Sequence, residues 1–553
     1  MPEIRFNVAQ PSLVVLGEGR LFFGASSIQR NTGSDVEPVT ITFQSPLVSI
    51  NQPPKGDSPR EEAATDKQTH VDLDALSDAL RKSVGGRHVD FTPSDRHTFN
   101  ERTAARALCA IAPGNAEALS AALAACRRFH VPVRVHAQRN GADSPRYAGA
   151  VVIHFDRLMN RIWSVDPNTR RARVDAGCSI AALNRAAATH GLTFGPSMTT
   201  PLDDGITVGE AIAGDLRGLG RNAAGTVAAF VDQLEVMTYD GSRFVVGETN
   251  DRDFERVVHE GGRRGEIYAG IRSFRQENDG VLLEHFYPDV RRLWGSALGS
   301  LPAARGGNIA RAFVGSEGTL AIIVQATISL VETLDARAYT TFQFPDPADA
   351  ADNVPFINAS EPLLIDAVRA EAARSERPIE GRMTVTFAAA DQHTANENAD
   401  ALVEMFRRHA DPPAMSGVVS GAPPSIEADS DGCVHIVAPL DALGSVVREV
   451  QTAFEKAALR GTIGGHAAAG NIDCSITGPD ASVERHRSIA NDLALFVARR
   501  HGTVSVGVGH GSADEPVPAG SELLDVLERY RAIWDPDGML GAAGGADAEG
   551  RRR

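Results

Sequence analysis

The segment that decides the fold reads Phe313-Val314-Gly315-Ser316-Glu317-Gly318-Thr319-Leu320. Two glycines enclose a short polar turn, and the apolar run from Leu320 to Val324 predicts a buried strand after it. Glycine reaches backbone conformations that other residues avoid, so a turn of this kind can bring backbone N–H groups close to a phosphate. The segment therefore predicts a glycine turn before a core strand, and it leaves open whether the turn serves packing or a ligand.

Further short motifs follow one another in order around this segment. Before it stand Val131-Pro132-Val133, Ala176-Gly177, Thr207-Val208-Gly209 and Asp232–Gly241, and after it stand Gly465-His466, Gly470-Asn471, Gly509-His510-Gly511 and Trp534-Asp535-Pro536-Asp537-Gly538. With these motifs, the chain from about residue 71 to 545 resembles the FAD-linked oxidases of the D-lactate dehydrogenase and glycolate oxidase type, within the vanillyl-alcohol-oxidase superfamily. A single motif is a weak hypothesis, whereas several in order support one another.

The resemblance implies an α+β fold in two parts. We expect residues 71–335 to form a PCMH-type FAD-binding domain of two subdomains, and residues 336–545 to form a ferredoxin-like substrate (cap) domain of the FAD-linked oxidase C-terminal type. The length of 553 residues also favours more than one core. Residues 1–70 are expected to be an N-terminal extension without an assigned role, and residues 546–553 a tail.

Local patterns predict particular elements within these parts. A helix is expected over residues 71–84, and Asn115 is the expected N-cap of a helix whose Leu119, Ala122, Leu123 and Cys126 share one face. Alternating apolar residues from Ile162 to Asp175 predict a hairpin. In the second part we expect strands over 339–344, 383–388 and 433–438, and helices over 395–409, 440–458 and 482–501.

The resemblance also implies the chemistry. Members of this family oxidise 2-hydroxy acids by hydride transfer to FAD and pass the electrons to a further acceptor. We therefore expect FAD as the cofactor and a small hydroxylated carboxylate as the substrate. A quinone, a cytochrome or an iron-sulfur subunit would serve as a separate electron acceptor.

By resemblance, three segments are expected to hold the FAD. In the first, the family's early glycines are replaced by Ala137 and Arg139, so that charge from His136 and Arg139 would substitute for backbone donors. In the second, Glu210 occupies a usual glycine position, and a carboxylate is unfavourable beside phosphate. The expected FAD contacts are His136, Arg139, Gly141, Thr207, Gly209, Ile212, Gly214, Gly218, Gly225, Gly315, Ser316, Glu317, Gly318 and Ile322.

The catalytic residues are expected near the end of the chain. His510 fits a general base, because an imidazole titrates near neutral pH and can take the hydroxyl proton. His466 and Asn471 are kept from the family's GHxGDGNxH pattern, which by resemblance supplies two histidines to a divalent metal in the metal-dependent members. Arg292, in the family's substrate segment, is suited to pair with a carboxylate. His466 and Asp473 are two metal donors where a site needs three or four, so a bound divalent metal is not expected.

Composition excludes several other classes of protein. A net charge of −16 disfavours nucleic acid as a partner, and no apolar run approaches the ~20 residues of a transmembrane helix. The start of the chain lacks the pattern of a signal peptide. The five cysteines are scattered without a CxxC pair, which predicts no iron-sulfur cluster and reduced thiols in a cytoplasmic protein.

Two alternatives to a hydroxy-acid oxidoreductase remain open. Departures from the family pattern at Ala137, Arg139, Glu210, Gly509 and others are compatible with a catalytically silent relative that serves as a binding or scaffold protein. The stretch Thr207–Gly214 also resembles sugar-oxidising members of the superfamily, which leaves a carbohydrate oxidase as a further reading.

Overall fold

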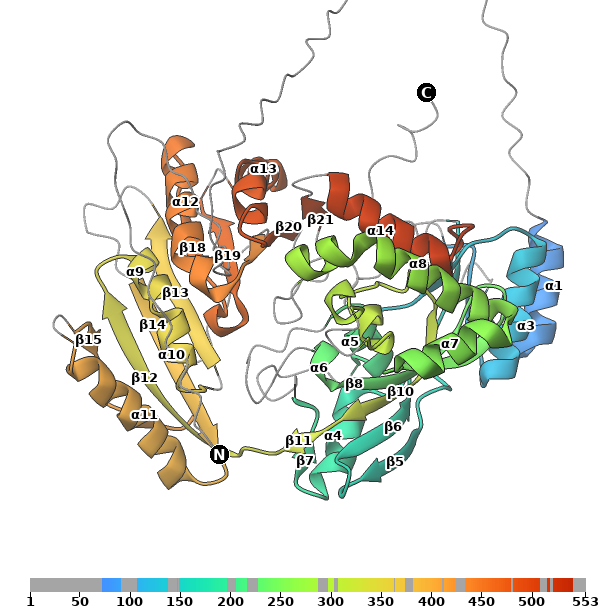
Figure 1. Cartoon of the computed structure of the whole chain (residues 1–553), viewed down its shortest axis with the longest axis horizontal. Coiled ribbons are helices and arrows are strands. Elements are labelled where there is room, and N and C mark those ends of the chain that lie inside the picture. The colour runs from blue at the N-terminus through green and yellow to red at the C-terminus, as the bar shows by residue number, and fades with distance from the viewer. Residues whose placement is uncertain are drawn as a thin grey trace, which may run out of the picture. The chain divides into compact units, whose positions relative to one another are not determined.

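The computed structural model describes residues 72–90, 107–137, 147, 149–195, 205–215, 227–286, 297–302, 307–362, 364–372, 381–409, 412–423, 433–478, 481–507, 515–517 and 521–540. Helices and sheets are mixed along the chain, so the fold is α+β as expected (Figure 1). Buried apolar side chains form two cores. The first core runs from Leu76 to Leu330 and includes Val526 to Leu540, and the second core runs from Ala338 to Val506. The expected extension 1–70 and tail 546–553 lie outside the described residues.

The first core begins with a small sheet and two helices. Helix α1 (Leu73–Val84) packs on helix α3 (Ala116–Arg128). The side chain of Asn115 accepts a hydrogen bond from the Ala118 N–H at 2.8 Å, which confirms the predicted N-cap. The sheet has the order β1-β2-β4-β3, made of β1 (Val89–Asp90), β2 (Cys109–Ile111), β4 (Val151–Ile153) and β3 (Val133–Val135).

A second, antiparallel sheet completes this core. Its order is β5-β6-β10-β8-β9, made of β5 (Ile162–Asp166), β6 (Arg171–Asp175), β10 (Ile322–Ser329), β8 (Val231–Met237) and β9 (Arg243–Gly247). The predicted hairpin is confirmed as β5 and β6, and the predicted core strand is the central strand β10. The elements around this sheet are α4 (Ile180–Ala188), α5 (Val208–Ala213), α6 (Val227–Phe230), the strand pair β7 (Leu192–Thr193) and β11 (Val331–Glu332), and the 3₁₀ turns η5 (Leu298–Ser300) and η7 (Ala310–Phe313).

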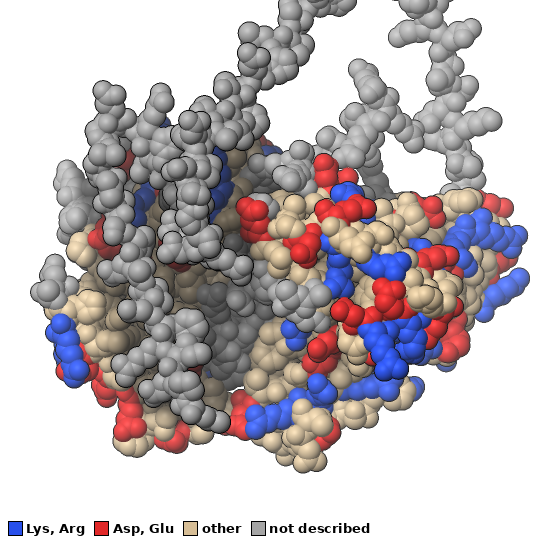
Figure 2. Space-filling view, viewed as in Figure 1, with Lys and Arg blue, Asp and Glu red and all other residues tan. Residues whose placement is uncertain are grey.

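Three helices cover part of the first core. Helix α7 (Asp251–Glu260) and helix α14 (Ser521–Trp534) both pack on α8 (Gly262–His285). Residues 521–540 thus contribute to the first core, although the sequence prediction assigned them to the cap domain. On the face drawn in Figure 2, basic and acidic side chains are interspersed over these helices. Ion pairs of these helices include Arg256 with Asp253 and Arg272 with Glu255.

The second core is built on one large sheet and several helices. The strands follow the order β15-β12-β14-β13-β18-β19-β17-β20-β21, with β16 paired to β12. They are β15 (Ala414–Met415), β12 (Ala336–Phe344), β14 (Gly381–Ala389), β13 (Leu364–Ala372), β18 (Gly461–Gly464), β19 (Asn471–Ile476), β17 (Cys433–Val437), β20 (Thr503–Gly507), β21 (Glu515–Val517) and β16 (Val419–Ser420). The helices are α9 (Pro347–Asp352), α10 (Val354–Asn358), α11 (Gln392–Arg407), α12 (Leu443–Lys456) and α13 (Val483–Ala498).

Two helix starts differ from prediction for local reasons. Helix α11 begins three residues earlier than the expected Ala395, because the Asp391 side chain accepts a hydrogen bond from the Thr394 N–H at 2.9 Å and caps the first turn. Helix α12 begins three residues later than the expected Leu440, because a 3₁₀ turn, η8 (Leu440–Ala442), follows Pro439.

Candidate functional site

The glycine turn at residues 315–318 lies directly against helix α5. The backbone N–H of Gly315 donates to the Ile212 carbonyl at 3.1 Å, and that of Glu317 donates to the Ala213 carbonyl at 2.7 Å. Gly315, Glu317 and Gly318 have positive φ angles of 75°, 54° and 76°. Only glycine adopts this conformation without strain, so the backbone at Glu317 is held there by its surroundings. Residues 207–214 and the glycine turn at 315–318, which are both expected to hold FAD, are thus brought together.

Helix α5 is fixed by its cap and by close packing. Thr207 caps it by accepting from the Glu210 N–H at 3.2 Å. The Gly209 N–H donates to the Ala176 carbonyl at 2.8 Å, and a Cβ added at Gly209 would lie 2.9 Å from the Ala176 Cβ. The glycine at 209, an expected FAD contact, is therefore required for packing on the Ala176-Gly177 turn. Glu210 is buried at the start of the helix.

Ser316 is the clearest sign of a ligand in this region. The residue is 3% exposed, and its Oγ has no hydrogen-bond partner among the described residues. A buried hydroxyl left unpaired costs about 1–3 kcal/mol. A bound molecule that offers a polar atom at this turn would remove that cost, so Ser316 is suited to contact the expected cofactor here. Ile322, another expected contact, is buried at the start of β10, and Gly214 ends α5.

The first expected FAD segment is arranged differently from the prediction. The His136 ring stacks on His154 with ring centroids 4.3 Å apart. Burial, followed by the nearby His154, lowers the pKa of His136 to about 4. His136 is therefore uncharged near neutral pH and lends no positive charge, contrary to the sequence expectation. The Ala137 N–H donates to the Tyr147 hydroxyl at 3.2 Å.

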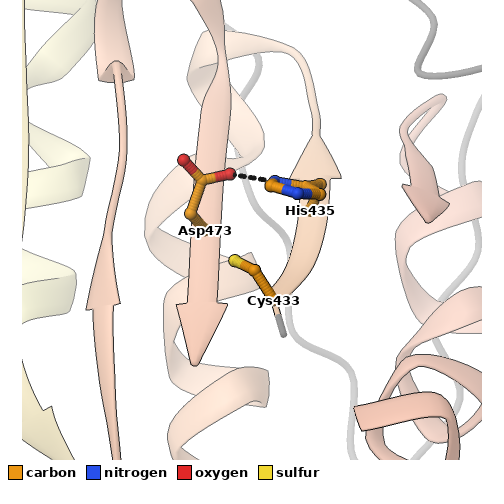
Figure 3. A group of neighbouring side chains, drawn as sticks. All are labelled: Cys433, His435 and Asp473. Atoms are coloured by element: carbon orange, nitrogen blue, oxygen red, sulfur yellow. Dashed lines mark hydrogen bonds and ion pairs between the residues drawn. The ribbon is translucent and has the colours of Figure 1, made fainter. Parts of the chain in front are cut away.

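A polar cluster lies on the second sheet, at the pairing of β17 with β19. His435 and Asp473 are register partners on these strands, and His435 Nδ1 lies 2.6 Å from Asp473 Oδ1 (Figure 3). The Asn471 amide donates to both carboxylate oxygens of Asp473 at 3.2 Å. Burial alone would lower the pKa of His435, but the hydrogen bond to Asp473 and the proximity of Cys433 outweigh it and raise the pKa to about 10.

Cys433 completes this cluster, and the sequence analysis missed both it and His435. One donor atom from each of Cys433, His435 and Asp473 lies within 4.8 Å of the others. Asp473 therefore groups with these two residues, whereas the sequence analysis paired it with His466. The missed signal was the spacing of Cys433 and His435, because residues two apart on a strand share a face.

The turn before β19 positions Asn471 and carries His466. The N–H groups of Ala469 and Asn471 donate to the His466 carbonyl at 3.0 and 3.2 Å. Gly470 has a φ of 73°, and a Cβ there would lie 2.2 Å from the Ala438 carbonyl oxygen. The remaining expected site residues lie outside the described residues, namely Arg139, Gly141, Gly218, Gly225, Arg292 and His510.

Comparison with protein families matches the two halves of the chain separately. The FAD binding domain family matches residues 107–247, and the family of FAD linked oxidases, C-terminal domain, matches residues 421–543. Within the described ranges, no helix has the length and apolar content needed to cross a membrane.

Two curated relatives that match the chain at low identity are hydroxy-acid dehydrogenases. A D-2-hydroxyglutarate dehydrogenase of Pseudomonas putida is 24% identical over 448 residues, covering 72% of this chain and 44% of the relative. A D-lactate dehydrogenase of Archaeoglobus fulgidus is 26% identical over 273 residues, covering 48% of this chain and 49% of the relative. The chain thus spans less than half of the length of each of these relatives.

Solved structures share the fold over most of the chain. The 4-ethylphenol oxidase from Gulosibacter chungangensis has a TM-score of 0.53 at 13% identity, covering 84% of this chain and 95% of that structure. The xylooligosaccharide oxidase from Myceliophthora thermophila has a TM-score of 0.52 at 12% identity, covering 84% of this chain and 98% of that structure. At such identities the likeness concerns the fold alone.

Proposed function

The chain belongs to the FAD-linked oxidase family, and from that premise we propose that it oxidises the CH–OH group of a small 2-hydroxy acid with FAD as its cofactor. The observation that carries the proposal is the contact between the glycine turn and α5, where the buried Ser316 hydroxyl is unpaired. The relatives named as D-2-hydroxyglutarate and D-lactate dehydrogenases support the substrate class.

We assign the cofactor to the segments around this contact. Ser316 would donate or accept a hydrogen bond, and the positive φ angles at Gly315 and Gly318 keep side chains out of the turn. Bound FAD supplies the hydride acceptor for the oxidation of an alcohol carbon. The protein residues then have to bind the acid, orient its carbon and remove the hydroxyl proton.

We propose the following roles for the protein residues. His510 takes the hydroxyl proton as the hydride leaves the carbon, so that a 2-oxo acid is formed, and Arg292 pairs with the substrate carboxylate. Both residues lie outside the described part of the chain. Asn471 is held at the start of β19 by its bonds to Asp473, and its Oδ1 remains to accept a hydrogen bond from a substrate hydroxyl. A separate protein or quinone receives the electrons.

One observation favours the silent-relative alternative. In the first FAD segment, His136 is uncharged near neutral pH and the Ala137 N–H already donates to Tyr147. Neither group is then ready to meet a diphosphate. A protein that does not retain FAD would fit this arrangement and would have a binding role instead. The carbohydrate-oxidase alternative is supported by the resemblance of Thr207–Gly214 to sugar-oxidising members and by a relative named as a decaprenylphosphoryl-beta-D-ribose oxidase, which is 38% identical over 103 residues, or 19% of this chain.

The test is the visible spectrum of the purified chain, followed by anaerobic reduction. We expect a flavin band near ~450 nm that survives desalting, and bleaching of that band by D-2-hydroxyglutarate, D-lactate or glycolate. Gly315→Arg should abolish FAD retention, because Gly315 is buried in the turn with a φ of 75°. Gly191→Arg is the matched control, since Gly191 has a φ of 68° in open space and should retain FAD.

Each result has a clear meaning for the proposal. Full FAD retention by Gly315→Arg would place the cofactor elsewhere. A flavoprotein that no hydroxy acid reduces would contradict the substrate class while leaving the cofactor in place. A colourless chain that takes up no added FAD would favour the silent relative.

A further inference from the structure

The cluster on the second sheet presents three different metal-binding atoms on one face. Val434 and Ile436 of β17 point into the second core, so Cys433 and His435 lie on the opposite face of the strand. Asp473 lies on the same face, because it is the register partner of His435 on β19. The side chains of His435 and Asp473 are 15% and 27% exposed, which leaves the cluster open to ions in solution.

The chemistry of these donors favours zinc over the harder cations. Thiolate, imidazole and carboxylate are the ligands that zinc takes in proteins, whereas calcium and magnesium prefer oxygen ligands alone. Bonds of about 2.0–2.3 Å in a tetrahedral site put the donor atoms about 3.3–3.6 Å apart. The three donors now lie within 4.8 Å of one another, with His435 and Asp473 at 2.6 Å. Shifts of about 1 Å in these side chains would give zinc distances.

Two buried oxygens beside the cluster point independently to a missing ligand. Asn471 is 5% exposed and donates its amide N–H groups to Asp473, but its Oδ1 has no hydrogen-bond partner among the described residues. Ser505 is fully buried on β20 as a register partner of His435, and its Oγ is likewise unpartnered. Buried polar atoms without protein partners are rare, and a bound water or ion usually satisfies them. A water on a bound metal could donate to either oxygen.

We propose that Cys433, His435 and Asp473 form a zinc site with one coordination position open to water or to an oxygen of a small molecule. Binding forms the Zn–S, Zn–N and Zn–O bonds and releases the thiol proton of Cys433 and any proton shared by His435 and Asp473. Asn471 is a positioning residue that holds the Asp473 carboxylate. The three metal donors are not used in the proposed hydroxy-acid oxidation, which shares only Asn471 with this site, so zinc binding can be tested apart from it.

The experiment measures zinc on the full chain after chelator treatment and addition of equimolar Zn²⁺. We expect one zinc per chain after gel filtration, and an at least tenfold loss of affinity in Cys433→Ser, His435→Gln and Asp473→Asn. Asn471→Ala should weaken binding by about 10–100-fold, as loss of an outer partner does. The matched control is His393→Gln, which removes an exposed histidine paired with Glu397 at 3.3 Å and should leave zinc binding unchanged.

Thiol reactivity gives a second readout that does not require a variant. Cys433 is the only one of the five cysteines that is not buried. Ellman's reagent should therefore modify one thiol quickly in the folded chain, and Zn²⁺ should protect it. Cobalt substitution should add a thiolate-to-metal charge-transfer band to the difference spectrum, and Cys433→Ser should lack this band.

These outcomes separate the zinc site from the proposed function. Zinc that binds equally well to Cys433→Ser and His435→Gln, or a chain that takes up no zinc, overturns the proposal. A Cys433 thiol that reacts equally with and without Zn²⁺ does the same. None of these measurements uses FAD or a hydroxy acid, so failure of the oxidoreductase proposal would leave them unaffected.

Discussion

Replacing Ser316 by alanine should change the stability of the FAD-free chain and its affinity for FAD in opposite directions. The Ser316 Oγ is buried and unpaired, so its removal takes away a desolvation cost of about 1–3 kcal/mol. The space left by one atom costs only a few tenths of a kcal/mol. We expect the free energy of unfolding of the FAD-free chain to rise by about 1 kcal/mol.

The same substitution should weaken FAD binding. A hydrogen bond from Ser316 to the cofactor contributes about 1 kcal/mol to the complex. The variant loses this bond in the complex, and its FAD-free form is about 1 kcal/mol more stable than that of the original protein. Both effects weaken binding, and together they reduce the free energy of FAD binding by about 2 kcal/mol. That sum corresponds to an increase of about 30-fold in the dissociation constant for FAD.

Urea unfolding followed by tryptophan fluorescence measures the stability, and quenching of flavin fluorescence measures the affinity. Ser329→Ala is the matched control, because the Ser329 Oγ donates to Asp232 at 2.9 Å on the neighbouring strand. It should lose about 1 kcal/mol of stability and keep its FAD affinity. The reasoning is refuted if Ser316→Ala destabilises the chain as the control does and leaves the affinity for FAD within about twofold of the original.

Two further predictions concern stability. The pKa of His136 is lowered from 6.5 to about 4, so below pH 6.5 the unfolded chain binds a proton that the folded chain does not. The first core should thus lose about 3 kcal/mol between about pH 7 and pH 4, and His136→Gln should remove most of this loss in urea titrations at several pH values. Gly470→Ala should lower the free energy of unfolding by about 3 kcal/mol, because its Cβ would lie 2.2 Å from the Ala438 carbonyl oxygen. Gly478→Ala, with a φ of 84° in open space, should cost only about 1 kcal/mol, and equal effects in calorimetry would contradict the argument.

Local elements could be predicted from the sequence because short-range rules determine them. The cap at Asn115 and the hairpin of β5 and β6 depend on residues within one or two turns of each other. The contact of Gly315 with Ile212 joins residues far apart in the chain, and only the order of the family motifs suggested it. Glycine at 209 was expected to serve the cofactor, but its close approach to Ala176 shows a packing requirement that no spacing reveals.

The cluster of Cys433, His435 and Asp473 could not be predicted from the sequence. A shift of one residue in the register of β17 against β19 would turn His435 away from Asp473, and register is a property of the folded sheet. From the sequence alone, the predicted partner of Asp473 was His466, because the two residues belong to the same motif. The prediction of a positive charge at His136 was wrong for a similar reason. His154 follows an adjacent strand and stacks on His136, a contact that the sequence does not reveal.

The position of α14 has a consequence for how the molecule folds. The first core contains residues that precede the second core in the chain and residues that follow it. The rings of Trp534 and Phe313, whose centroids lie 4.9 Å apart, can therefore come into contact only after the intervening segment has been synthesised. On the ribosome, the residues of the second core are synthesised before those that close the first. Closing a loop of this length adds only a few kcal/mol of entropy cost, since the cost grows with the logarithm of loop length. Damage to helix α14 is therefore expected to destabilise the first core, which holds the proposed flavin site, although most residues of that core precede the second core in the chain.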